Sequence, residues 1–176
     1  KPVVCAGAML LVQDSELALD DPVCHYAPNF GRHGKQGITL RHLMTHTSGL
    51  PDQLEENIPL RQQHAGLDRF IHSVCELQPL FAPGSHVHYQ SMGLLMLGHV
   101  IEQVTGLPLR VFLRERLFGP LGMRDTTLGL PTGGLCSSVR ANDSPVETQS
   151  SAESNWGWNS LYWRDLGAPW GGLHAT

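Results

Sequence analysis

Histidine is unusually frequent in this chain, with ten among 176 residues. His42 and His46 lie four residues apart on an expected helix, and His86 and His88 lie two apart on an expected extended segment. Either spacing can point two imidazoles the same way, as a metal site requires. However, no Glu follows His42 in the H-E-x-x-H manner, and neither pair has a carboxylate close by. We therefore expect histidines that hydrogen-bond to backbone, and keep a metal-binding protein that uses these four as the weakest alternative.

Ser48 is the next group that could do chemistry, because a neighbouring base such as His46 can activate a serine hydroxyl. This serine lacks the G-x-S-x-G turn of a nucleophile elbow. Thr47-Ser48-Gly49 more simply ends a helix, so we interpret His46 and Ser48 as structural.

The four cysteines are widely scattered, at Cys5, Cys24, Cys75 and Cys136. They form no C-x-x-C pair and no short-chain disulfide framework, so they do not fix the compartment of the protein. Cys5 lies in an apolar run, where we expect a buried free thiol.

Five helices are expected to position these residues. They cover about residues 2–13, 40–47, 67–77, 91–105 and 108–118, and the first of them is almost entirely apolar. Thr39 is a plausible N-cap for the second helix, and Gly106 stands where the fourth must end. Strand signals are sparse, and residues 131–154, rich in Gly, Ser, Thr and Asn, are expected to be irregular. The pattern predicts a mainly helical chain.

Composition excludes two classes of partner. Twelve Lys and Arg against 16 Asp and Glu give a formal net charge of −4, and no basic patch is visible, so nucleic acid is not expected to bind. The longest apolar stretch, Val3 to Val12, is shorter than the roughly 20 residues of a membrane span. The chain begins with Lys1 and carries no signal-peptide pattern, so we expect a processed chain or a fragment.

Residues 39–50 read TLRHLMTHTSGL. This resembles the TLRHLLTHTSGL motif of the serine β-lactamase and penicillin-binding-protein-like hydrolases, which include class C β-lactamases, D-alanyl-D-alanine carboxypeptidases and esterases. Four further stretches resemble family motifs in the same order, at residues 17–23, 89–106, 120–126 and 168–176. The resemblance implies a β-lactamase/transpeptidase-like α+β fold, of which this chain forms mainly the helical part, with few strands.

The family resemblance implies roles for three residues. The family's nucleophile is the Ser of Ser-x-x-Lys at the start of a buried helix, and the register places that lysine at Lys1, with the serine three residues before it. Tyr89 resembles the motif tyrosine, a base during acylation and an acid toward the leaving group. Ser91 stands at a substrate-binding position where most relatives have Asn. A hydroxyl has one donor where an amide has two, which weakens any claim of β-lactam specificity and suits esterase-like or peptidase-like variants.

The third family motif, Lys/His-Thr/Ser-Gly on a strand, does not occur at the expected place. Pro131-Thr132-Gly133 has the Thr-Gly but no cation, and follows Tyr89 too soon. The same strand supplies half of the usual oxyanion hole. The resemblance thus implies a serine hydrolase that forms an acyl-enzyme on a small-molecule amide or ester (a β-lactam, a D-Ala peptide or an ester) without a cofactor. We expect this chain alone to be inactive.

Several alternatives stay open from the sequence. A non-catalytic binding module of the same family would tolerate Ser91, and the residue three before Lys1 decides between such a module and an enzyme.

We expect residues 1–128 to form a helical subdomain with the active-site Lys and Tyr, and residues 129–176 to lead back toward the family's sheet. Aromatic residues near the end of the chain could line a cleft, although packing against the helices is the default; they are Trp156, Trp158, Tyr162, Trp163 and Trp170. The resemblance suggests a periplasmic or secreted protein, and oligomeric state stays unknown.

Overall fold

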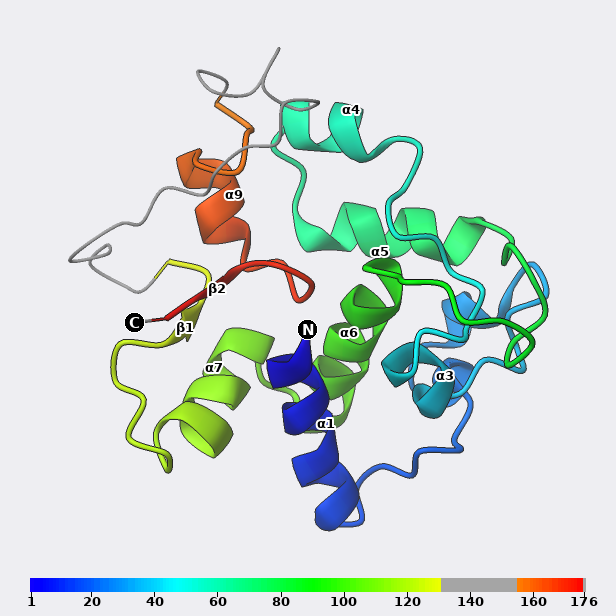
Figure 1. Cartoon of the computed structure of the whole chain (residues 1–176), viewed down its shortest axis with the longest axis horizontal. Helices are drawn as coiled ribbons and strands as arrows, with labels where there is room; N and C mark the ends of the chain where they lie inside the picture. The colour runs from blue at the N-terminus through cyan, green and yellow to red at the C-terminus, as the bar shows by residue number, and fades with distance from the viewer. Residues whose placement is uncertain (131–154, 176) are drawn as a thin grey trace.

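The computed structural model describes residues 1–130 and 155–175, and helices dominate them (Figure 1). The elements in chain order are α1 (Pro2–Gln13), α2 (Val23–Tyr26), the 3₁₀ turn η1 (Pro28–Gly31), α3 (Leu40–Met44), α4 (Asn57–Gln62), α5 (Leu67–Glu76), α6 (Met92–Thr105), α7 (Leu109–Leu113), the π-helical turn η2 (Arg114–Phe118), β1 (Thr127–Leu128), α9 (Leu161–Leu166) and β2 (Leu173–His174). Over these residues, the expectation of a mainly helical chain with few strands is confirmed.

Helix α6 is the centre of the fold. It contacts α1, α2, α3, α5 and α7, which surround it in Figure 1. Nine of its 14 residues are buried, because its sequence is apolar on nearly every side rather than on one stripe. Each fully buried Leu, Val, Ile or Met side chain contributes roughly 1.5–3 kcal/mol. Gly106 ends the helix in the left-handed region, with φ of 68°, as the sequence predicts.

Two glycines let the helices around α6 approach closely. A Cβ atom at Gly7 of α1 would lie 2.9 Å from Leu113 Cδ2, and one at Gly98 of α6 would lie 2.9 Å from Leu109 Cδ2. A Cβ atom at either position would force the facing leucine side chain to move, so glycine allows the present close packing of these helices. The packing at Gly7 helps to place α1 against α7.

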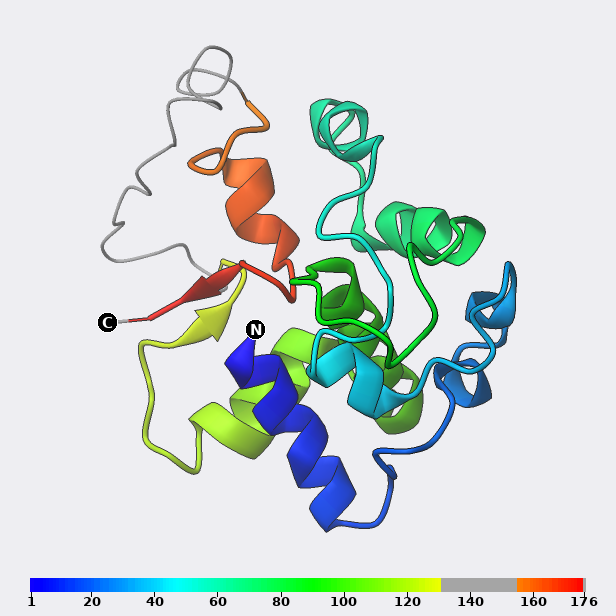
Figure 2. The ribbon, with the colours of Figure 1, turned by 45° about the vertical axis from the view of Figure 1, so that its right-hand side comes forward.

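The two strands pair antiparallel at one edge of the molecule, with Thr127 opposite His174 and Leu128 opposite Leu173 (Figure 2). This pairing brings the end of the chain back beside the segment that follows η2. It also fixes where the residues just before β2 lie, next to the N-terminal end of α1 (Figure 2).

The polar, Gly-rich loop at residues 29–37 is anchored more firmly than its composition suggests. Phe30 and Lys35 in this loop are fully buried. The Lys35 ammonium donates to the carbonyl of Cys75 at 3.0 Å and to the carbonyl of Leu77. A cation beside the last carbonyls of α5 is favourable, because these carbonyls lack helical partners.

The predicted helix boundaries agree with the structure at most ends. Thr39 is the N-cap of α3, and its hydroxyl accepts from the backbone N–H of His42. The predicted helix at 108–118 is helical throughout, but it changes from α to π winding after Leu113. The short helices α2, α4 and α9 were not predicted, and the predicted irregular segment at residues 131–154 lies outside the described residues.

Helix α1 is less enclosed than its apolar sequence predicts. It buries Val4, Gly7, Ala8 and Leu11 on one face. Cys5 is a free thiol, as expected, but it is half-buried rather than buried. The reason is geometric, since α1 packs at the edge of the helical layer and turns only one face toward α6 and α7.

No single helix among the described residues is both long and apolar enough to cross a membrane. In the part of the chain that the structure describes, α6 taken together with α7 and η2 reaches that length, but this pair is bent by 80°.

A buried arginine joins α4 to α9 and to the segment before it. Arg61 is 4% exposed, and its guanidinium lies 4.4–5.2 Å from the ring centroids of Trp156, Trp158 and Trp163. Its Nε and Nη2 atoms also donate to the carbonyl of Trp156, at 3.3 and 3.2 Å. We call these four residues the Arg61 cluster. The aromatic faces compensate in part for the loss of water around the cation.

We predict that Arg61→Ala lowers the free energy of unfolding by about 3 kcal/mol or more, because it removes desolvated cation–π contacts and charged hydrogen bonds. The free energy of unfolding of Arg61→Lys should lie between those of the wild type and Arg61→Ala, since lysine keeps the charge but not the planar stacking. Urea unfolding of the purified protein measures both. Arg69→Ala, at an exposed position on α5, is the matched control and should change stability by less than about 0.5 kcal/mol. Equal losses for Arg61→Ala and Arg69→Ala would contradict the role of the cluster.

Gly49 fixes the loop that leaves α3. Its φ is +81°, and a Cβ atom there would lie 2.4 Å from the carbonyl oxygen of Phe81. Its own carbonyl accepts from the N–H of Leu80 at 2.8 Å. The loop after α3 therefore runs tightly against residues 79–81.

We predict that Gly49→Ala destabilises the protein by more than Gly34→Ala does. Both glycines have a similar positive φ, but no atom lies within 4 Å of a Cβ built at Gly34. Gly34→Ala should cost about 1–2 kcal/mol from backbone strain alone, and Gly49→Ala should exceed it because the Phe81 carbonyl must also move. Thermal unfolding of the two variants measures the difference. Equal destabilisation would show that the close approach to Phe81 is unimportant.

Candidate active site

The Lys1 ammonium joins three segments that are far apart in the sequence. Its Nζ atom donates to Ser91 Oγ at 3.0 Å and to the carbonyl oxygen of Trp170 at 3.2 Å. The same atom lies 4.6 Å from the centroid of the Tyr89 ring. The structure therefore brings together Lys1, Tyr89 and Ser91, the three site residues that the family motifs single out.

Tyr89 and Ser91 lie on either side of a buried glutamine. Gln90 is fully buried, whereas Tyr89 is 59% exposed and Ser91 is 5% exposed. Tyr89 and Ser91 both reach Lys1, from the segment that leads into α6. Ser91 is also the N-cap residue of α6, so its place depends on where this central helix starts.

Gln90 holds this segment against α3. Its Nε2 atom donates to the carbonyls of His42 and Leu43, at 3.2 and 3.1 Å. Its Oε1 atom accepts from Ser48 Oγ at 2.5 Å. All of these groups are buried or half-buried, where an unpaired amide would be costly. Ser48 is thus part of a buried hydrogen-bond network, which agrees with its interpretation as a structural residue.

Asp52 is a member of the site that the sequence did not reveal. Its Oδ1 atom accepts a hydrogen bond from Ser91 Oγ at 2.5 Å. Asp52 lies in the loop after Gly49, a region without secondary structure, and no local pattern marks it. One signal was present: it follows the TLRHLMTHTSGL motif by two residues, so it must lie near the end of α3.

His46 packs beside Tyr89. Their ring centroids are 5.0 Å apart, and His46 Nδ1 accepts from the N–H of Gln90 at 3.3 Å. Burial, and next the charge of Lys1, lowers the pKa of His46, while Asp52 acts in the opposite direction. A neutral imidazole keeps Nδ1 available as an acceptor. His46 itself has a positive φ of 60°, in the turn that follows α3.

The histidines that could have formed a metal site have other partners. His42 Nδ1 lies 3.2 Å from the backbone nitrogen of Thr39 and completes the cap of α3. The His86 and His88 rings pack edge-on against Phe81. Among residues 1–130 and 155–175, no group of three or more His, Cys, Asp or Glu side chains is placed to hold a metal ion.

The described tryptophans pack against helices and against one another. The Trp170 ring lies 5.9 Å from Phe70 of α5 and 6.0 Å from Trp163 of α9, between ring centroids. Trp163 in turn belongs to the Arg61 cluster. These contacts fix the backbone of Trp170, whose carbonyl accepts from Lys1.

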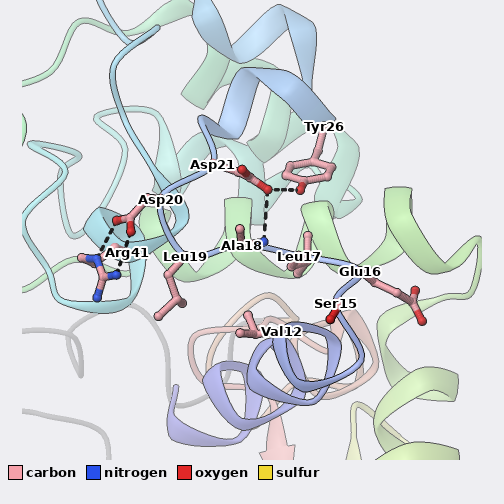
Figure 3. A pocket seen from close by; sticks show the side chains of 10 residues that line it. All are labelled: Val12, Ser15, Glu16, Leu17, Ala18, Leu19, Asp20, Asp21, Tyr26 and Arg41. Atoms are coloured by element: carbon pink, nitrogen blue, oxygen red, sulfur yellow. Dashed lines mark hydrogen bonds and ion pairs between the residues drawn. The ribbon is translucent and has the colours of Figure 1, made fainter.

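An open pocket lies at the other end of α1 (Figure 3). Four of its polar side chains are already hydrogen-bonded: Arg41 donates twice to Asp20, and Asp21 Oδ2 accepts from Tyr26 Oη and from the N–H of Ala18. Since α1 has 12 residues and rises about 1.5 Å per residue, this pocket is remote from Lys1. It takes no part in the site.

The sequence comparisons identify relatives of several activities. The family model described as Beta-lactamase matches residues 1–176. The chain is 36% identical over 140 residues to "Esterase EstB" of Burkholderia gladioli, an alignment that covers 71% of this chain and 36% of EstB. It is 31% identical over 134 residues to "Penicillin-binding protein 4*" of Bacillus subtilis, which covers 72% of this chain and 28% of that protein. The chain thus spans about a third of the length of these curated relatives.

Comparison with solved structures gives the same fold class as the sequence motifs. A crystal structure of a penicillin-binding protein homologue from Caulobacter crescentus matches 99% of this chain and 49% of that one, with a TM-score of 0.73 and 24% identity. This likeness shows the β-lactamase/transpeptidase fold, and the predicted fold class is confirmed. With the family model matching the whole sequence, the chain belongs to the Beta-lactamase family of esterase and penicillin-binding-protein relatives.

Proposed function

We propose that the complete protein is a serine hydrolase that forms an acyl-enzyme on a small amide or ester. The observation that carries the proposal is the meeting of Lys1 with Tyr89 and Ser91, from segments about 90 residues apart in the sequence. Membership of the Beta-lactamase family supports it, as do relatives named as esterase and penicillin-binding protein.

The nucleophile in this proposal is a serine three residues before Lys1. Continuing α1 by one turn would put that side chain on the same face as Lys1, because residues three apart on a helix are neighbours. The serine oxygen attacks the substrate carbonyl while its proton passes to whichever of Lys1 and Tyr89 is in its deprotonated, basic form, and the carbonyl oxygen takes up the negative charge. The proton then goes to the leaving group, and water later cleaves the acyl-enzyme.

Tyr89 suits proton transfer in this scheme. Its side chain is exposed enough to meet a small substrate, while its ring is held between Lys1 and His46. Ser91, at the position where most relatives have Asn, favours an ester or peptide over a β-lactam as the substrate.

We also propose that the chain divides as its motifs suggest. Residues 1–128 form the helical subdomain with Lys1 and Tyr89, and residues 129–176 lead back toward the sheet of the fold. The pairing of β1 with β2 supports this division, because it marks the point where the chain returns to the first segment.

We predict that a fluorophosphonate probe labels the complete gene product at the serine three residues before Lys1. A polypeptide of residues 1–176 alone should not be labelled, because the nucleophile in this proposal lies before Lys1. Mass spectrometry of the labelled protein locates the adduct. Labelling of an internal serine in residues 1–176, or a residue other than serine at the upstream position, would overturn the proposal.

We predict that Tyr89→Phe lowers kcat for a p-nitrophenyl ester by about 10²–10⁴-fold, the usual contribution of general acid–base catalysis. The phenylalanine keeps the ring between Lys1 and His46, so the fold should be unchanged. Tyr26→Phe, which removes a hydroxyl bonded to Asp21 far from Lys1, is the control and should keep full activity. Equal rates for Tyr89→Phe and the wild type would exclude the tyrosine from proton transfer.

A further inference from the structure

Ser91 has a single hydroxyl proton, and this proton points to Asp52. Ser91 Oγ accepts from Lys1 Nζ at 3.0 Å, so its one donor goes to Asp52 Oδ1 at 2.5 Å. This is the short distance typical of a hydroxyl that donates to a carboxylate. The three groups form a chain from a cation through a hydroxyl to an anion.

The position of Asp52 is fixed by its neighbours in the chain. Leu50 and Leu54, on either side of it, are buried, and the N–H of Leu50 donates to Ser48 Oγ at 3.1 Å. Ser48 is bonded in turn to the buried Gln90. Within the described part of the chain Asp52 makes no direct ion pair, so its hydrogen bond to Ser91 is not a by-product of a salt bridge.

We propose that Asp52 is a positioning residue for Lys1, acting through Ser91. By accepting the hydrogen bond from the Ser91 hydroxyl, Asp52 turns a lone pair of Ser91 toward the Lys1 ammonium. The negative charge of Asp52 then lies one hydroxyl away from that ammonium. Without Asp52 the hydroxyl is free to rotate and to offer its proton to Lys1 instead of a lone pair. An Asn amide fixes both directions by its own geometry, whereas a serine needs the carboxylate.

In this arrangement Ser91 contacts Lys1 rather than the substrate. Since its donor is taken by Asp52, Ser91 acts on Lys1 and gives no hydrogen bond to the substrate carbonyl. The positioning role of Asp52 rests on the proposed function, because the position of Lys1 affects the rate only if Lys1 takes part in acylation.

The test is a double-mutant cycle in the complete gene product, with p-nitrophenyl butyrate as substrate. Asp52→Ala should lower kcat by about tenfold to a hundredfold, as expected for losing a charge-assisted hydrogen bond, and should change KM by less than about threefold. Asp52→Asn should recover part of the activity, because its amide oxygen can still accept from Ser91 although the negative charge is lost. Ser91→Ala should lower kcat by as much as Asp52→Ala does. The kcat of the double variant should lie within about twofold of that of Ser91→Ala.

Glu55→Gln is the matched control, a neutralised carboxylate at an exposed position of the same loop. It should leave kcat unchanged, and all variants should unfold at nearly the temperature of the wild type. Additive losses from Asp52→Ala and Ser91→Ala, no rescue by Asp52→Asn, or a loss confined to KM would overturn the inference while leaving the proposed hydrolase intact. A wild-type protein that neither hydrolyses the ester nor reacts with a fluorophosphonate would instead overturn the proposed function, and the positioning role with it.

Discussion

The position of one ammonium group, that of Lys1, is the constraint on which this structure depends. A half-buried cation needs partners for its N–H groups, and Lys1 finds them on segments about 90 and 170 residues further along the chain, at Ser91 and Trp170. The face of Tyr89 covers another side of the cation. To satisfy this one group, the start of α1, the start of α6 and the segment before β2 must all meet.

Two layers of contacts keep this meeting point in place. The buried Gln90 fixes Tyr89 and Ser91 against the end of α3, and the close approach of α1 at Gly7 sets the position of α1 against α7. On the other side, the rings of Trp163 and Trp170 connect the Arg61 cluster to the carbonyl that Lys1 uses. Tyr89 and Asp52 lie on loops, but packed helices and buried hydrogen bonds hold these loops in place, as precise chemistry requires.

The parts of the fold with local signals could be predicted from the sequence. The Thr39 cap, the Gly106 stop and the apolar pattern of α6 are read from residues next to one another, and the motif order led to Lys1 and Tyr89. Asp52 and Gln90 could not be predicted, since their partners are 39 to 48 residues away and depend on how α3 packs on α6. Arg61 and Lys35 were equally hidden, because a charged residue is expected at the surface unless tertiary contacts supply aromatic faces or carbonyls.

The most direct measurement is a crystal structure of the complete protein after reaction with a fluorophosphonate. The account predicts an adduct on the serine three residues before Lys1, with its Oγ within hydrogen-bond distance of Lys1 Nζ and with Ser91 still between Lys1 and Asp52. An adduct on another serine, or a Lys1 ammonium that turns away from Ser91 toward solvent, would contradict it.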